Sequence, residues 1–270
     1  GVAFNDLSDA LKANFRSQGF EKGMLDVPND SRIINPLQKE IAIYLSSFSS
    51  SMENAYVKLF KSLGGDAIGF NLITLNYDLL IERSLFLLGV QRINYGINKF
   101  DGEYYLLKLH GSSNFIPDFG NFHIKGIVGI NSGSFLETEN VKALSTHQEI
   151  KTWCEADRDN DFSPVMCMYN KDKRAVINAS YLEKMKSEYL KTISATRLLI
   201  IIGVKYIEHD HHVWDVICEN DAALIIVDPQ PSEAFLLLLE KRNAKYEVIK
   251  KSFHLSIDDI VDMTSRMSKA

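Results

Sequence analysis

The sequence predicts an α/β protein with a doubly wound, mostly parallel sheet that carries helices on both faces. Short apolar runs alternate with longer segments of helical periodicity along most of the chain. Two of these runs, residues 198–202 and 223–227, are apolar throughout, as is typical of strands buried inside a parallel sheet. A chain of 270 residues, 46% of them hydrophobic, is long enough to bury such a core.

Apolar spacing and punctuating residues predict the helices. Apolar side chains recur every three to four residues between Phe4 and Phe15, which predicts a helix over residues 4–24. Pro28 and Pro36 predict a break after it. The further predicted helices cover residues 37–48, 52–63, 79–88, 141–153, 179–196, 213–220, a segment through 236–239, and 256–267.

The predicted strands follow from short apolar runs that end at turn residues. They cover residues 70–74, 104–109, 198–202, 223–227 and an edge strand at 246–249. We expect residues 1–270 to form a single domain, with residues 1–66 as its helical N-terminal part. Residues 114–161 are weakly patterned and glycine-rich, which indicates an insertion or lid within that domain.

Composition excludes several classes of protein. A net charge of -5 argues against a general nucleic-acid-binding protein, so direct nucleic-acid binding is not expected. No apolar run approaches the roughly 18 residues that span a bilayer, and no secretory signal opens the printed sequence. The three cysteines are far apart, which indicates reduced thiols in the cytoplasm and excludes a tetra-cysteine zinc site. The run of residues 209–212 holds three histidines, but neighbouring residues rarely face one ion, so no metal site is expected.

Polar side chains follow two of the predicted strands directly. Asn76 and Asp78 come after the strand at 70–74, and His110 follows the strand at 104–109. Parallel sheets bind ligands at the carboxyl ends of their strands, so these side chains are candidates for a site. The local alternative for Asn76 and Asp78 is ordinary turn chemistry. The alternative for His110 is a packed, hydrogen-bonded histidine.

Four motifs in order resemble one family. Residues 74–78 (TLNYD) resemble the T-x-N-[YI]-D motif of sirtuin-like (silent information regulator two-like) proteins, and residues 109–112 (LHGS) resemble their L-H-G-S motif. Residues 199–210 are similar to the family's apolar strand followed by G-x-S-x-x-x-x-D, and residues 225–229 to its next strand. Glu82 extends the first motif in the manner of the NAD hydrolases of bacterial anti-phage defence. The resemblance implies a Rossmann-like sheet.

The resemblance also implies roles for particular residues, with NAD as the substrate and no zinc or other metal. Asn76 would hold the nicotinamide amide or an attacking water, and His110 would act as base on a ribose hydroxyl or on water. Asp78 would orient the nicotinamide end of the pocket. The implied nucleotide-binding positions are Thr74, Tyr77, Gly111, Ser112, Gly203, Lys205, Asp210 and Asp228. Asp210 could instead cap a helix, and Asp228 could cap the turn before Pro229.

Two features depart from the family pattern. The family opens with a strand and a G-A-G-x-S loop that holds the dinucleotide phosphates, whereas the residues at 1–4 (GVAF) resemble the stretch that follows this loop. Either that loop precedes Gly1 in the native protein, or the chain is a degenerate member. Lys205 stands where the family usually has serine.

The expected function is therefore hydrolysis of NAD to nicotinamide and ADP-ribose, as an enzyme of anti-phage defence in the cytoplasm. The alternative is a catalytically inactive nucleotide-binding or regulatory module, and a less favoured one is an NAD-dependent protein deacylase. The expected partners are NAD or an ADP-ribose-like nucleotide, together with a second copy of the chain or a protein that gates the activity. No membrane association is expected.

Overall fold

The computed structural model describes residues 1–19, 23–24, 26–28, 30–64, 69–96, 104–118, 120, 140–156, 162–167 and 179–267. Its helices are α1 (Val2–Asn5), α2 (Asp9–Gln18), α4 (Ser31–Ser47), α5 (Ala55–Leu63), α6 (Leu80–Leu87), α7 (His147–Ala156), α8 (Ala179–Ser194), α9 (His211–Glu219), α10 (Glu233–Lys241), the 3-10 turn η2 (Phe253–Leu255) and α11 (Ile257–Met267). Its strands are β1 (Asn71–Thr74), β2 (Ile93–Asn94), β3 (Tyr104–Lys108), β4 (Phe115–Pro117), β5 (Val141–Ala143), β6 (Leu198–Ile202), β7 (Ala223–Val227) and β8 (Tyr246–Ile249).

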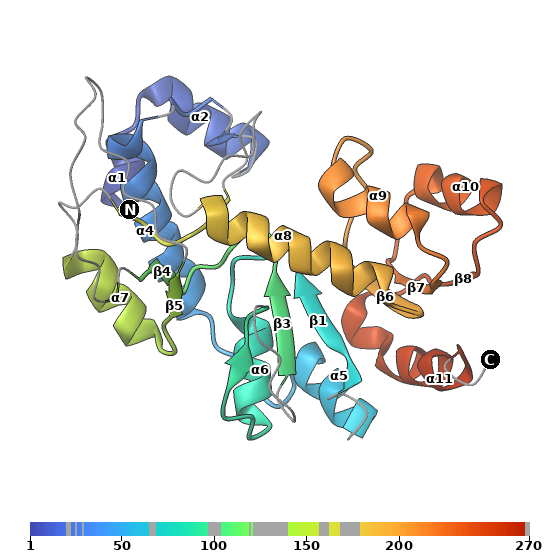
Figure 1. The fold of residues 1–270 in the computed structure, drawn as a ribbon. Coiled ribbons are helices and arrows are strands. Elements are labelled where there is room, and N and C mark those ends of the chain that lie inside the picture. Colours follow the sequence, from blue (N-terminus) through green and yellow to red (C-terminus); the bar gives the residue numbers. More distant parts are fainter. Residues whose placement is uncertain are drawn as a thin grey trace. The chain divides into compact units, whose positions relative to one another are not determined.

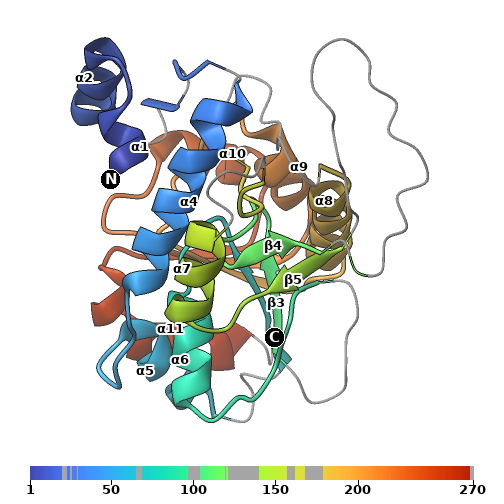
Figure 2. The ribbon, with the colours of Figure 1, turned by 90° about the vertical axis from the view of Figure 1, so that its left-hand side faces the viewer.

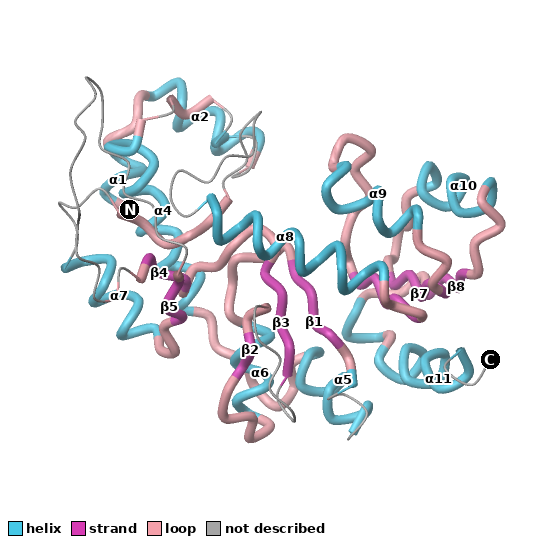
Figure 3. The backbone as a smooth tube through the Cα atoms, viewed as in Figure 1, coloured by secondary structure: helices cyan, strands magenta, loops and turns pink. Residues whose placement is uncertain are grey.

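Parallel strands flanked by helices confirm the predicted α/β class (Figure 1). The strands form two three-stranded sheets, with orders β1-β3-β2 and β6-β7-β8, and an antiparallel pair of β4 and β5 (Figure 3). In the second sheet β6 and β7 pair over their whole length, from Leu198 opposite Ala223 to Ile202 opposite Val227. These are the two runs that the sequence predicts as buried strands.

The central strand β7 shows why a continuous apolar run suits this sheet. Ile225 and Val227 pack in one hydrophobic cluster with residues of α5 and α11. Leu224 and Ile226 are also buried, and alternation along a strand points them to the opposite face. Helices α9 and α10 lie on that face (Figure 1). Both faces are covered, so every position of the strand must be apolar.

The chain divides into two compact units. The first unit comprises residues 1–49, 73–80 and 108–185, and the second comprises residues 50–72, 81–107 and 186–270. In the first unit α4 lies beside α7 (Figure 2). The second unit contains the β6-β7-β8 sheet. The expectation of a single domain over residues 1–270 stays a prediction.

Two of the predicted helices near the N-terminus differ clearly from the observed ones. The prediction of one continuous helix over residues 4–24 is wrong, because the chain leaves α1 at residue 6 and starts α2 anew at Asp9, where the Ser8 side chain caps α2 by accepting a hydrogen bond from Leu11 N. Helix α4 begins before Pro36 rather than after it, although an interior proline costs a helix roughly 3 kcal/mol. Capping by Asp30 and burial of Ile34 and Leu37 in one cluster offset that cost.

The predicted insertion at residues 114–161 lies partly outside the described residues. Its described part contains β4, β5 and α7. The helix predicted over residues 141–153 is wrong at its start, because residues 141–143 pair with β4 as a strand. Helix α7 begins only at His147. The Glu149 side chain accepts hydrogen bonds from the backbone amides of Ser145 and Thr146, just before the helix starts.

We expect Ile225→Ala to lower the free energy of unfolding by about 2–5 kcal/mol, because it opens a cavity at a fully buried position of β7. Glu247 stands opposite Ile225 on β8 and is exposed, so Glu247→Ala is the matched control, with an expected change of about 0.5 kcal/mol or less. Urea denaturation followed by circular dichroism measures both. Equal losses in the two variants would contradict the assignment of β7 as the core strand.

Candidate functional site

The loop after β1 holds Asn76 and Asp78 in a compact turn. Thr74 Oγ1 accepts a hydrogen bond from the Asn76 backbone amide at 3.1 Å. Asp78 Oδ1 accepts one from Leu80 N at 2.9 Å, and thereby caps the first turn of α6. The Asn76 side chain is exposed, and Asp78 is half-buried. Ordinary turn chemistry therefore accounts for the backbone of this loop. The Asn76 side chain nevertheless stays accessible.

The loop after β3 holds His110 in a tight turn that only glycine can close. Gly111 N donates to Lys108 O at 2.9 Å, and Gly111 has a φ of +84°. A Cβ at this position would lie 2.1 Å from Val165 O. Ser112 N donates to that same Val165 oxygen at 2.9 Å, and Cys167 N donates to His110 O at 2.7 Å. The backbone of residues 163–167 thus fixes the turn that presents His110.

The structure brings the two loops together. Leu109 N donates to Thr74 O at 3.1 Å, and Ser113 N donates to Tyr77 O at 3.0 Å. The Tyr77 hydroxyl donates to Cys167 O at 2.5 Å, which ties the first loop to the segment that supports the second. Thr74, Tyr77, Gly111 and Ser112, all predicted nucleotide contacts, therefore also shape the loops through their backbone or side chains.

The other four candidates lie in the second unit, after β6 and β7. Gly203 N donates to Val227 O at 3.0 Å, and Gly203 has a φ of +62°. Asp228 Oδ1 accepts a hydrogen bond from Gln230 N at 2.7 Å, which is the local cap that the sequence allows. Lys205 is exposed, and the Asp210 carbonyl accepts bonds from the first turn of α9. Each unit thus holds one group of candidates, and their roles stay predictions.

Sequence reasoning missed two contributors to the first group. Lys108 is fully buried, and its Nζ donates to the main-chain oxygen of Asp78. A charged residue inside an otherwise apolar run was the available signal. For the segment 163–167, the sequence does not predict the backbone pairing with residues 110–112, which includes an antiparallel bridge between Gly111 and Met166.

The described ranges give little support for a membrane span, a metal site or a reactive thiol. No helix there is long and apolar enough to cross a membrane. No group of three or more His, Cys, Asp or Glu side chains in the described ranges is placed to hold a metal. In the histidine run at 209–212, His211 Nδ1 lies 3.2 Å from Asp215 Oδ1. Burial raises the pKa of the Cys218 thiol, which disfavours the reactive thiolate at neutral pH.

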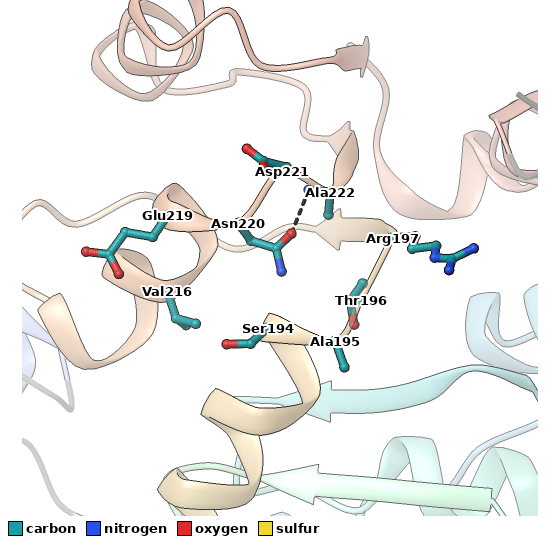
Figure 4. Close-up of a pocket in the computed structure, with 9 residues that line it drawn as sticks. All are labelled: Ser194, Ala195, Thr196, Arg197, Val216, Glu219, Asn220, Asp221 and Ala222. Carbon is teal, nitrogen blue, oxygen red and sulfur yellow. Dashed lines mark hydrogen bonds between the residues drawn. The ribbon is translucent and has the colours of Figure 1, made fainter.

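A polar hollow of about 620 Å³ opens at the amino ends of β6 and β7 (Figure 4). In its lining Asn220 Oδ1 accepts a hydrogen bond from Ala222 N at 2.6 Å. Gly203 and Asp228 follow the opposite, carboxyl ends of the same strands. Ligands of parallel sheets bind at those carboxyl ends, so this hollow is not the candidate site.

We expect Gly111→Ala to destabilise the protein by about 3 kcal/mol or more, from positive-φ strain plus overlap with the Val165 carbonyl. Gly89→Ala is the matched control, because Gly89 has a φ of +88° with open space around it, so only strain of about 1–2 kcal/mol is expected. Guanidinium denaturation of both variants measures the difference. If Gly111→Ala were no worse than Gly89→Ala, the close approach of residue 165 would be refuted.

No protein-family model matches the sequence, and no match was found among curated proteins. Among solved structures, the chain is similar to a Sir2 mutant with a p53 peptide and NAD, at 13% identity and a TM-score of 0.49, covering 89% of this chain and 85% of that one. It is also similar to a sirtuin studied for its substrate affinity, at 11% identity and a TM-score of 0.47, covering 100% and 84%. A third similar structure is a Sir2 homologue bound to NAD, at 13% identity and a TM-score of 0.43, covering 84% and 72%.

Proposed function

We propose that this chain is a sirtuin-like NAD hydrolase, which splits NAD into nicotinamide and ADP-ribose. One observation carries the proposal: the two motif loops are bonded directly to each other, through Leu109 N to Thr74 O and Ser113 N to Tyr77 O. Asn76 and His110 therefore belong to adjoining loops at strand ends. A strand-end position of this kind is where α/β proteins bind nucleotides.

The proposed reaction breaks the bond between the nicotinamide nitrogen and C1′ of the ribose. Nicotinamide leaves with the bonding electron pair, and the ribose carbon becomes oxocarbenium-like. Water adds to that carbon, and His110 takes the proton that the water releases, since imidazole titrates near neutral pH. Asn76 holds the nicotinamide amide or the attacking water, because a carboxamide both donates and accepts hydrogen bonds. Asp78 orients the nicotinamide end.

The remaining predicted nucleotide-binding residues belong to the same proposal. The exposed Lys205 suits a phosphate, and Asp228 retains a second carboxylate oxygen that suits a ribose hydroxyl. Gly203 and Asp210 complete that group. A role in anti-phage defence, and control by a second copy or a gating protein, belong to the same proposal and rest on the motif resemblance.

The second candidate function is an inactive nucleotide-binding module. It is favoured by one sequence fact, namely that Lys205 replaces the usual serine. A protein of this kind would bind NAD or ADP-ribose without turnover. Protein deacylation is less favoured, because three cysteines cannot form a tetra-cysteine zinc ribbon.

We expect His110→Ala to lower the rate of nicotinamide release about 10²–10⁴-fold, the usual contribution of a general base. Asn76→Ala should lower it by about 10²-fold or more, since it removes a fixed polar contact. Chromatographic assay of nicotinamide, on full-length protein, measures both. His254→Ala, at an exposed histidine of η2, is the control and should match the wild type. NAD binding in calorimetry without any turnover would favour the inactive module instead.

Asp78→Asn separates the capping role of Asp78 from its proposed chemical role. Asparagine caps helices about as well as aspartate, so we expect an unchanged melting temperature. If the carboxylate orients the nicotinamide end, turnover should still fall by about tenfold or more, as for a lost charged hydrogen bond. Asp78→Ala should lose both activity and about 1 kcal/mol of stability. Full activity in Asp78→Asn would limit Asp78 to the cap.

A further inference from the structure

Lys108 is unusual because a fully buried strand position is normally filled by an apolar side chain. Lys108 is the last residue of β3, in the run YYLLKL, and its exposed fraction is 0%. Taking an ammonium group out of water costs free energy, and an apolar side chain of similar volume often stabilises such a position better. The contacts that Lys108 makes therefore indicate what the charged group contributes.

Lys108 contacts both candidate loops at once. Its main-chain oxygen accepts the hydrogen bond from Gly111 N that closes the His110 turn. Its Nζ reaches the other loop and donates to the main-chain oxygen of Asp78.

The hydrogen bond from Lys108 Nζ acts together with a second hydrogen bond, from Ser113 N, to the same loop. Ser113 N donates to the carbonyl of Tyr77, and Lys108 Nζ donates to the carbonyl of Asp78, so two consecutive carbonyls are fixed. The two donors lie on either side of His110 in the sequence. The Asp78 side chain is meanwhile fixed by its bond from Leu80 N. These two bonds thus fix the peptides that follow Tyr77 and Asp78, from donors on the two sides of His110.

We propose that Lys108 is a positioning residue that sets the spacing between the Asn76–Asp78 loop and His110. This inference rests on the proposed NAD hydrolysis, with Asn76 and His110 as its reacting side chains. Lys108 itself is buried and acts through the backbone of Asp78, so it does not touch the substrate. Displacement of a reacting group by about 1 Å costs about 10²-fold in rate, which is the scale of effect expected.

Lys108→Met is the direct test, because methionine fills the position without a donor. We expect kcat to fall about 10–100-fold while KM changes by about twofold or less, since the loop moves but the binding groups remain. Lys142→Met, at an exposed lysine of β5 in the same unit, is the matched control and should keep the wild-type kcat. Wild-type kcat in Lys108→Met would overturn the proposal.

Lys108→Ala separates positioning from a general loss of structure. Propylammonium can enter the space left and donate to the Asp78 carbonyl, so we expect it to restore part of kcat, whereas propanol, which carries no charge, should not. Loss of activity in step with loss of folded protein in both Lys108 variants, without rescue by propylammonium, would overturn the proposal.

Hydrogen exchange provides a readout that does not depend on turnover. We expect faster exchange of the Ser113 and Leu80 amides in Lys108→Met than in Lys142→Met, with unchanged exchange in α11. Unchanged protection at Ser113 and Leu80 would overturn the positioning role. If wild-type protein releases no nicotinamide, the proposed function fails, and this exchange comparison alone decides whether Lys108 positions the loop.

Discussion

The candidate site depends on the close approach of the Val165 carbonyl to Gly111. That oxygen stands where the Cβ of any other residue would be, and it accepts the hydrogen bond from Ser112 N. The approach brings Met166 and Cys167 alongside the His110 turn, and Cys167 in turn receives the Tyr77 hydroxyl. Without this close approach, the segment 163–167 would not support either loop, because it is bonded to both of them.

Both main-chain and side-chain groups make the hydrogen bonds that define the two loops. Backbone amides and carbonyls make most of the bonds that define the loops, as expected of buried chain that must satisfy its own polar groups. Lys108 adds a side-chain hydrogen bond, which fixes the Asp78 carbonyl. The Asn76 side chain is exposed.

The parts of the fold that depend on local patterns could be predicted from the sequence, and the parts that depend on remote contacts could not. Strands β6 and β7 have the predicted limits because a run buried on both faces must be apolar throughout. Helix α4 was mispredicted because packing of Ile34 and Leu37 outweighs the local effect of Pro36. In the site, the strand-end positions of Asn76 and His110 follow from the sequence. The pairing of the segment 163–167 does not, since it depends on backbone contacts with residues far away in the sequence.

The contact between Gln38 and Met166 has a consequence for the order of folding. Gln38 Nε2 donates to Met166 O at 3.0 Å across 128 residues of chain, and Ser163 Oγ donates to Gln38 Oε1. Contacts of such separation require a long loop to close before they stabilise anything, so they form late and slowly. During synthesis the loops at Asn76 and His110 leave the ribosome long before the segment that supports them. The site should therefore mature only after the chain has passed residue 167, whereas helices such as α4 can form early.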